Sequence, residues 1–149
     1  MEHIRPATLS DISRIAEILV FVKRINFRPI FRNDDYSFGE LQVLSVAKEY
    51  AEDADLLSRT YVYDDGLIRG LIEIRGSEVV KLYVDHFFQG HGIGDKLLQF
   101  AVGRFGTNYL YALEKNSRAL AFYSRHGFTF QGEWEYEEGT PERLLKLVR

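Results

Sequence analysis

The sequence predicts a mixed α/β (α+β) fold in which one sheet carries helices on both faces. Two observations predict it. Strand-like runs separated by short turns fill the middle of the chain, and helical and strand-like segments alternate in its C-terminal half. The chain has 149 residues, of which 46% are hydrophobic and 28% charged. This size and composition are typical of one domain with an ordinary core, so we expect a single domain over residues 1–149.

The N-terminal part begins with a short strand expected at residues 3–7, followed by a helix. Apolar residues recur there at spacings of three and four and form one stripe, consisting of Ile12, Ile15, Ile18, Leu19 and Val22. Because Pro29 disfavours helical conformation at the residue before it, we expect this helix to end near Phe27. A second helix is predicted from about Gly39 to Asp53.

Three strand-like runs follow, at residues 61–63, 67–75 and 78–84. The first two are separated by Asp65-Gly66, a pair that tolerates the positive φ of a tight hairpin turn. Gly76-Ser77 separates the second run from the third. We therefore expect an antiparallel meander.

The C-terminal half alternates helix and strand. A helix is expected from 92 to 105, a strand from 109 to 113 and a helix from 117 to 126. Two final strands are predicted around 128–136 and 143–148. Together with the meander, these segments give six to seven strands and about four helices.

Composition excludes several kinds of chemistry. The chain has no cysteine, which rules out disulfides, cysteine-based zinc or redox sites and a catalytic thiol. The net charge of −3 does not favour a nucleic-acid surface or an anionic-membrane anchor. No apolar run approaches the roughly 18 residues of a membrane span, and the N-terminus does not resemble a leader. We expect a soluble, cytoplasmic protein with no nucleic-acid or membrane partner.

The segment Gln89–Lys96 is the most informative part of the sequence. It has glycines at positions 90, 92 and 94 and lies between a strand and an amphipathic helix. Such a turn directs free N–H groups and the positive end of a helix dipole at one place, which suits a phosphate or pyrophosphate. Neither common phosphate motif fits: Asp95 stands where a dinucleotide fingerprint needs glycine, and Lys96 is followed by Leu97 where a P-loop needs Ser or Thr.

Two segments resemble the GNAT superfamily of N-acetyltransferases. Gln89, Gly92 and Gly94 match its Gln/Arg-x-x-Gly-x-Gly/Ala loop, which binds the pyrophosphate of acetyl-CoA. Residues 116–128 resemble its Asn-x-x-Ala-x-x-Phe-Tyr-x-x-x-Gly-Phe segment. The resemblance implies a mostly antiparallel sheet of six to seven strands with about four helices on both faces. It also implies an acyltransferase that moves an acetyl group from acetyl-CoA, as co-substrate and without a metal, to an amine.

The resemblance also implies which residues hold the co-substrate. The cofactor-binding residues expected from it are Leu82, Val84, Gln89, Gly90, His91, Gly92, Ile93, Gly94, Asn116 and Tyr123. Backbone groups of residues 82–84 would bond the pantetheine amides and donate an N–H to the thioester carbonyl. That role requires a bulge that separates this strand from the next parallel one.

A base and an acid are needed for amide formation, because an amine is mostly protonated at neutral pH and the thiolate leaving group needs a proton. Glu78 is the expected base, since it lies eleven residues before Gln89, the offset of the catalytic glutamate in the histone acetyltransferase branch. Glu73 and a water molecule stay open as alternatives. Tyr123 is the expected acid, because the resemblance implies that its hydroxyl meets the CoA sulfur. At seven residues after Asn116, it returns to within about 20° of the same helix face.

The acceptor is left open by the sequence. By resemblance, residues 23–38 and 131–138 shape its side of the site, and acidic residues in the second segment are suited to attract a cation: Glu133, Glu135, Glu137 and Glu138. The acceptor can be a polyamine, an amino acid, an aminoglycoside, a peptide N-terminus or a lysine side chain. The sequence also leaves open whether a longer acyl group is transferred and whether the protein forms a homodimer.

Because no thiol can hold the acyl group, we expect direct transfer to a primary amine in a ternary complex. The alternative is a non-catalytic GNAT-fold module that binds acyl-CoA as a sensor or interaction domain.

Overall fold

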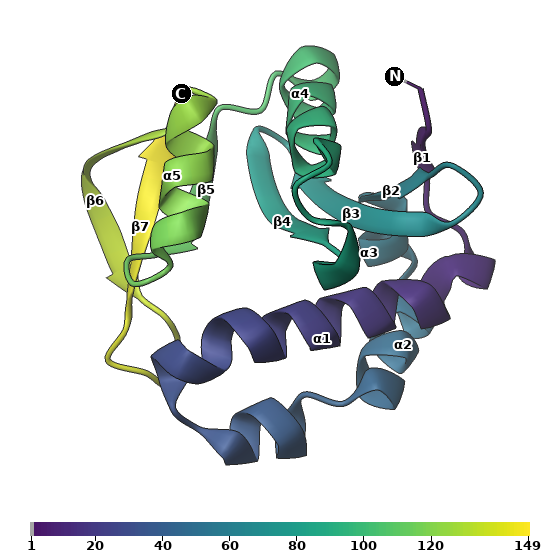
Figure 1. The fold of residues 1–149 in the computed structure, drawn as a ribbon, viewed down its shortest axis with the longest axis horizontal. Helices are drawn as coiled ribbons and strands as arrows, with labels where there is room; N and C mark the ends of the chain where they lie inside the picture. The colour runs from purple at the N-terminus through teal and green to yellow at the C-terminus, as the bar shows by residue number, and fades with distance from the viewer. Residues whose placement is uncertain (1) are drawn as a thin grey trace.

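A computed structural model describes residues 2–149 and contains one seven-stranded sheet with the strand order β1-β2-β3-β4-β5-β7-β6 (Figure 1). The strands are β1 (Ile4–Pro6), β2 (Thr60–Asp64), β3 (Ile68–Arg75), β4 (Glu78–Val84), β5 (Tyr109–Leu113), β6 (Thr129–Tyr136) and β7 (Arg143–Val148). Neighbouring strands are antiparallel except β4 and β5, which run parallel. The mixed, mostly antiparallel sheet and the meander expected over residues 61–84 are therefore confirmed.

Helices cover both faces of the sheet, as expected. The α-helices of the described residues are α1 (Ile12–Phe31), α2 (Val43–Glu52), α3 (Ala54–Ser58), α4 (Ile93–Phe105) and α5 (Ser117–Arg125), with short helical turns η1 (Leu9–Asp11), η2 (Asp35–Glu40) and η3 (His86–Phe88). Figure 1 shows α1 and α2 side by side, and α4 and α5 together on the other side of the sheet. The pair α1 and α2 packs on one cluster of buried apolar side chains, which we call the α1 cluster. The pair α4 and α5 packs on a second, which we call the α4 cluster. Strand β3 contributes to both, with Leu71 in the α1 cluster and Ile72 in the α4 cluster.

The first helix continues one turn past the end at Phe27 that Pro29 suggested, so that expectation was wrong. Pro29 lies in the last turn, where its missing N–H removes a single hydrogen bond, to the carbonyl of the partly exposed Ile25. The added turn packs the Phe31 ring 5.7 Å from that of Phe27. The helix closes at Arg32, which has a φ of 52°.

The second helix also differs from its prediction, since α2 begins at Val43 rather than near Gly39. The backbone is extended at Leu41, whose side chain is buried in the core. Arg24 of α1 holds this segment by donating to the carbonyls of Ser37 and Leu41, each at 2.9 Å. A tertiary contact from another helix therefore overrides the local helical tendency.

Strand β4 contains the bulge that the proposed cofactor role required. Opposite it on β3, Ile74 pairs with Val79 and Glu73 pairs with Lys81, which leaves Val80 as an extra residue. On its other edge, β4 pairs with β5 at two positions just before the bulge, and the strands then separate. The bulge thus lies where the two parallel strands part.

Two further findings concern the described residues. None of the helices in residues 2–149 is both long and apolar enough to cross a membrane. Within the same range, we find no group of three or more His, Asp or Glu side chains arranged to hold a metal ion.

Candidate functional site

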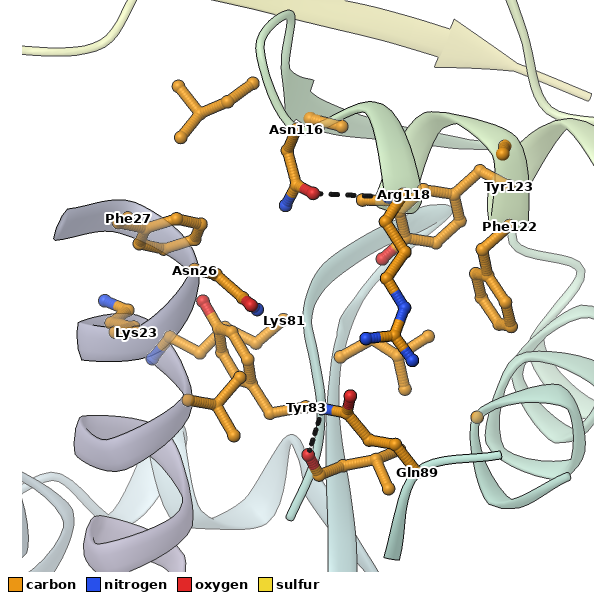
Figure 2. A pocket seen from close by; sticks show the side chains of 18 of the residues that line it. Lys23, Asn26, Phe27, Lys81, Tyr83, Gln89, Asn116, Arg118, Phe122 and Tyr123 are labelled. Atoms are coloured by element: carbon orange, nitrogen blue, oxygen red, sulfur yellow. Dashed lines mark hydrogen bonds between the residues drawn. The ribbon is translucent and has the colours of Figure 1, made fainter. Parts of the chain in front are cut away.

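A cavity of about 690 Å³ opens where β4 and β5 separate. Its lining comes from α1, η2, β4, β5, the loop after η3, the start of α4, α5, β7 and the residue that follows β6 (Figure 2). We call the part formed by residues 89–94 the loop end. The opposite part, formed by Lys23, Asn26, Phe27, Tyr36 and Glu137, is the α1 end.

The loop end is built to accept an anion. Gly90 and Gly92 have φ values of 82° and 80°, in the left-handed region that glycine adopts without a Cβ penalty. Gly92 is the N-cap of α4, so the first N–H groups of a thirteen-residue helix are presented there. The Gln89 side chain donates to the Val84 carbonyl at 3.1 Å and fixes the loop to the end of β4.

Close packing of α5 on α4 shapes the next part of the cavity. A Cβ at Gly94 would lie 3.4 Å from the Phe122 ring, at the short end of ordinary van der Waals contact, so the two helices pack closely here. Asp95 in the first turn of α4 meets the His126 ring at 2.6 Å. These contacts fix the start of α4 relative to α5.

Helix α5 directs polar side chains into the cavity. Asn116 caps the helix by accepting from the Ala119 N–H at 3.3 Å. The Tyr123 hydroxyl points into the cavity, and Arg118 reaches across it toward Gln89 (Figure 2). Burial raises the pKa of Tyr123 well above its ordinary value, so the phenol stays protonated at neutral pH.

Strand β4 forms the floor and divides its side chains between the two faces of the sheet. Leu82 and Val84 pack on the α4 cluster, whereas Tyr83 packs on the α1 cluster. Lys81 lines the cavity, and its ammonium lies 3.1 Å from a carboxylate oxygen of Glu73.

The α1 end contains charges of both signs. Burial, followed by the charge of Lys81, lowers the pKa of Lys23. Burial also raises the pKa of Glu137, against the opposing effect of the Lys23 charge. Phe27 and Tyr36 lie beside these two groups in the lining.

The structure brings most of the expected cofactor residues together. Those that line the cavity are Leu82, Val84, Gln89, Gly90, Gly92, Ile93, Gly94, Asn116 and Tyr123. His91 does not belong to the lining, and its side chain is exposed.

The two expected base candidates lie outside the cavity lining. Glu78 is at the start of β4, opposite Tyr109 of β5, and burial raises its pKa. Glu73 is 1% exposed on β3 and is held by Arg59 at 3.2 Å and by Lys81. These ion pairs hold the Glu73 carboxylate in the protein interior.

Several residues of the cavity were not identified from the sequence: Lys23, Lys81, Tyr83 and Arg118. The region containing Lys23 was expected to face the acceptor, but no local pattern selects this lysine. Among the acidic residues expected there, Glu137 lines the cavity, whereas Glu133 pairs with Lys146 at 2.9 Å. Glu135 and Glu138 are exposed and are not part of the lining.

Comparisons with known proteins agree with this geometry. Residues 57–130 match the family model of the acetyltransferase (GNAT) domain. The peptidyl-lysine N-acetyltransferase YjaB of Salmonella typhimurium is 30% identical over 80 residues, which are 53% of this chain and 55% of that protein. The aligned region thus spans about half of this curated relative.

Solved structures share the fold over nearly the whole chain. The apo form of YjaB from Escherichia coli has a TM-score of 0.72 at 19% identity, covering 97% of this chain and 95% of that one. The PaiA N-acetyltransferase of Thermoplasma acidophilum, in complex with coenzyme A, has a TM-score of 0.68 at 19% identity, covering 98% of each chain.

Proposed function

The chain belongs to the GNAT superfamily of N-acetyltransferases, and from this premise we propose that it transfers an acetyl group from acetyl-CoA directly to a primary amine in a ternary complex. One observation supports the proposal above others. The cavity between the separated strands brings the glycine loop and the Tyr123 hydroxyl to one space. These groups come from the two segments that resemble the family.

The residues of the loop end fit acetyl-CoA. Positive φ at Gly90 and Gly92, with the free N–H groups of α4, suits the pyrophosphate. Beyond the bulge, β4 no longer pairs with β5, so its facing edge can hydrogen-bond the pantetheine amides. Asn116 and Arg118 line the same path. The PaiA N-acetyltransferase of Thermoplasma acidophilum, which shares the fold at 19% identity, was solved in complex with coenzyme A, and this supports the proposal that the cavity takes this class of co-substrate.

Acetyl-CoA supplies an activated acetyl thioester. The chain supplies the hydrogen bonds: an N–H from the segment 82–84 for the thioester carbonyl and the Tyr123 hydroxyl for the sulfur. Because burial raises the pKa of Tyr123, the phenol holds its proton until sulfur develops negative charge. A thiol has a pKa of about 8.5, so the phenol acts as a hydrogen-bond donor in the transition state rather than as a strong acid.

For the base we propose Glu78, acting through a water molecule because its carboxylate lies outside the cavity lining. Its raised pKa favours proton acceptance near neutral pH. We expect Glu78→Gln to lower kcat and to shift the acidic limb of the pH–rate profile. Unchanged kcat would transfer the role to Glu137, which lines the cavity and also has a raised pKa.

The test of the function is release of CoA thiol from acetyl-CoA in the presence of a panel of primary amines. Thiol release that requires an amine, with an acetylated product identified by mass, supports the enzyme. Tight acetyl-CoA binding without release by any amine supports the alternative, a binding module. Intersecting initial-rate lines are expected for a ternary complex, and parallel lines would contradict direct transfer.

A further inference from the structure

The α1 end of the cavity contains two charges of opposite sign that the protein itself does not pair. Two other charged groups of the lining have partners, since Lys81 pairs with Glu73 and Asp95 meets His126. Arg118 and Arg125 also line the cavity, but both belong to α5 and lie away from the α1 end. Among the described residues 2–149, neither Lys23 nor Glu137 forms an ion pair. Both side chains nevertheless line the cavity and are only partly exposed.

Each of these charges is poorly solvated where it stands. Burial disfavours the charged form of both groups, lowering the pKa of Lys23 and raising that of Glu137. Their charges influence each other without direct contact. An uncompensated charge in a cavity is costly, and a ligand that presents the opposite charge to each group relieves both costs.

On the premise of the proposed acetyltransferase function, we propose that the acceptor is a small zwitterion, a molecule with a primary amine and a carboxylate. Lys23 binds the carboxylate, and Glu137 holds the ammonium. Asn26, one turn of α1 beyond Lys23, is placed to assist with its amide (Figure 2). Phe27, Phe31 and Tyr36 surround the same space, which favours an apolar group between the two charges, as in an aromatic or aliphatic α-amino acid.

The reaction balances without a further reactant. The amine nitrogen forms a bond to the acetyl carbon, and the bond from that carbon to sulfur breaks. The ammonium loses two protons in all. One ends on the CoA sulfur, and the other leaves to solvent through the carboxylate base, giving an N-acetyl amino acid and the free thiol.

Matched substrates test the proposal. We would compare CoA release with L-phenylalanine and with L-phenylalaninamide, which lacks only the carboxylate charge. The amide has the more acidic ammonium, so intrinsic reactivity at pH 7 favours it. We expect kcat/KM to be at least about tenfold higher for the free acid, as one charge-assisted contact provides. Equal or faster reaction of the amide would overturn the proposal.

The panel also separates this inference from the proposed function. Nα-acetyl-lysine methylamide and spermidine are included as amines without a carboxylate. Turnover of these amines alone would overturn the zwitterion while leaving the acetyltransferase intact. If no amine releases CoA, the zwitterion site is tested separately, by calorimetric measurement of L-phenylalanine binding to the CoA-loaded protein. Binding that Lys23→Met abolishes supports the zwitterion site without the enzyme, and absence of binding overturns both.

Variants at Lys23 test carboxylate binding through the difference in KM between the acid and the amide, which a merely structural role of Lys23 would not change. We expect Lys23→Met to raise KM for L-phenylalanine about tenfold or more and to leave the amide nearly unaffected, whereas Lys23→Arg retains activity with the acid. The matched control is Lys48→Met, an exposed lysine of α2. An equal effect of Lys23→Met on acid and amide would contradict carboxylate binding.

Glu137 is tested in the same way. Because it holds the ammonium, Glu137→Gln should raise KM for both the acid and the amide. The control is its exposed neighbour, in Glu138→Gln. Thermal melting of each variant shows whether it is folded, and a folded Glu137→Gln protein with unchanged KM for both substrates would remove Glu137 from the site.

Discussion

At the scale of single residues, the Tyr123 hydroxyl is the side-chain donor to which we assign the hydrogen bond to sulfur. It lies in the cavity beside the separated strands and remains protonated at neutral pH. We expect Tyr123→Phe to lower kcat about 10²-fold, as loss of one hydrogen-bond donor to the developing charge does. The Kd for acetyl-CoA should change by less than about fivefold, because one hydroxyl hydrogen bond is lost.

Stopped-flow thiol release and equilibrium binding of acetyl-CoA measure these two effects separately. Tyr136→Phe is the control, since that side chain is 61% exposed and outside the cavity lining. A Tyr123→Phe variant with full kcat would exclude the hydroxyl from the mechanism.

Glu73 is a buried carboxylate that we expect to contribute to the free energy of unfolding. Its partners Arg59 and Lys81 have side-chain exposures of 26% and 21%, so water still reaches both cations. Glu73→Gln would leave them without their shared anion, and we expect a loss of about 2 kcal/mol in the free energy of unfolding.

Urea denaturation measures that loss, with Glu52→Gln as the control because Glu52 is 67% exposed and pairs loosely with Lys48. An unchanged denaturation midpoint would show that solvent already screens the Glu73 cluster.

At the scale of elements, the glycine that caps α4 and one glycine in its interior should respond in opposite ways to replacement by alanine. Gly92 caps the helix with a φ of 80°, whereas Gly103 lies inside it, where an added methyl group would meet no other atom within 4 Å. Gly92→Ala should destabilise the protein by about 1 kcal/mol and raise the KM for acetyl-CoA. Gly103→Ala should stabilise it by about 0.5–1 kcal/mol with no change in KM.

Thermal melting and acetyl-CoA saturation curves of the two variants test this contrast. The same sign of stability change for both would contradict the assigned role of left-handed backbone at Gly92.

Local chemistry explains why some elements were predictable. The loop glycines were identified because a strand-to-helix turn that binds an anion needs positive φ, and Gly90 and Gly92 both have it. The strands of the meander follow from alternation and from the Asp65-Gly66 turn. The helix end near Phe27 was wrong because the rule for Pro29 ignores the packing of the last turn.

At the scale of the whole molecule, Arg5 joins the N-terminal strand to the start of the first helix and to β2. It donates to Asp11 at 2.7 Å and to Asp64 at 3.0 Å. The hydrogen bond from Arg5 lowers the pKa of Asp11, against the effect of burial. A lowered folded-state pKa stabilises the protein above the unfolded value of about 3.9 and loses that effect as the pH falls through the folded value.

Asp11→Asn should therefore cost about 2 kcal/mol in the free energy of unfolding at pH 7. The difference from the unchanged protein should shrink as the pH falls below about 4, because the unfolded chain then takes up a proton that the folded carboxylate, with its lowered pKa, still resists. Urea unfolding from pH 3 to 7 measures this, and a difference that is independent of pH would contradict the ion pair.

The acceptor end of the site depends on long-range placement, which explains why sequence patterns left it open. Lys23 and Glu137 are far apart in the chain and line the same end of the cavity, although they come from α1 and from the residue after β6. No spacing rule links them. Glu78 was chosen by its offset from Gln89, but the bulge at Val80 changes which residues of β4 face the cavity.

The extra residue in β4 also bears on which sequence changes would preserve the opening between β4 and β5. The opening between β4 and β5 is a property of the backbone, set by one inserted position and by where pairing stops. Side-chain replacements around it can alter which amine is accepted while the opening persists. Deleting one residue at Val80 would restore the pleat and shift the facing side chains. Point substitutions around the opening can therefore change acceptor preference, whereas an insertion or deletion in this strand would alter the opening itself.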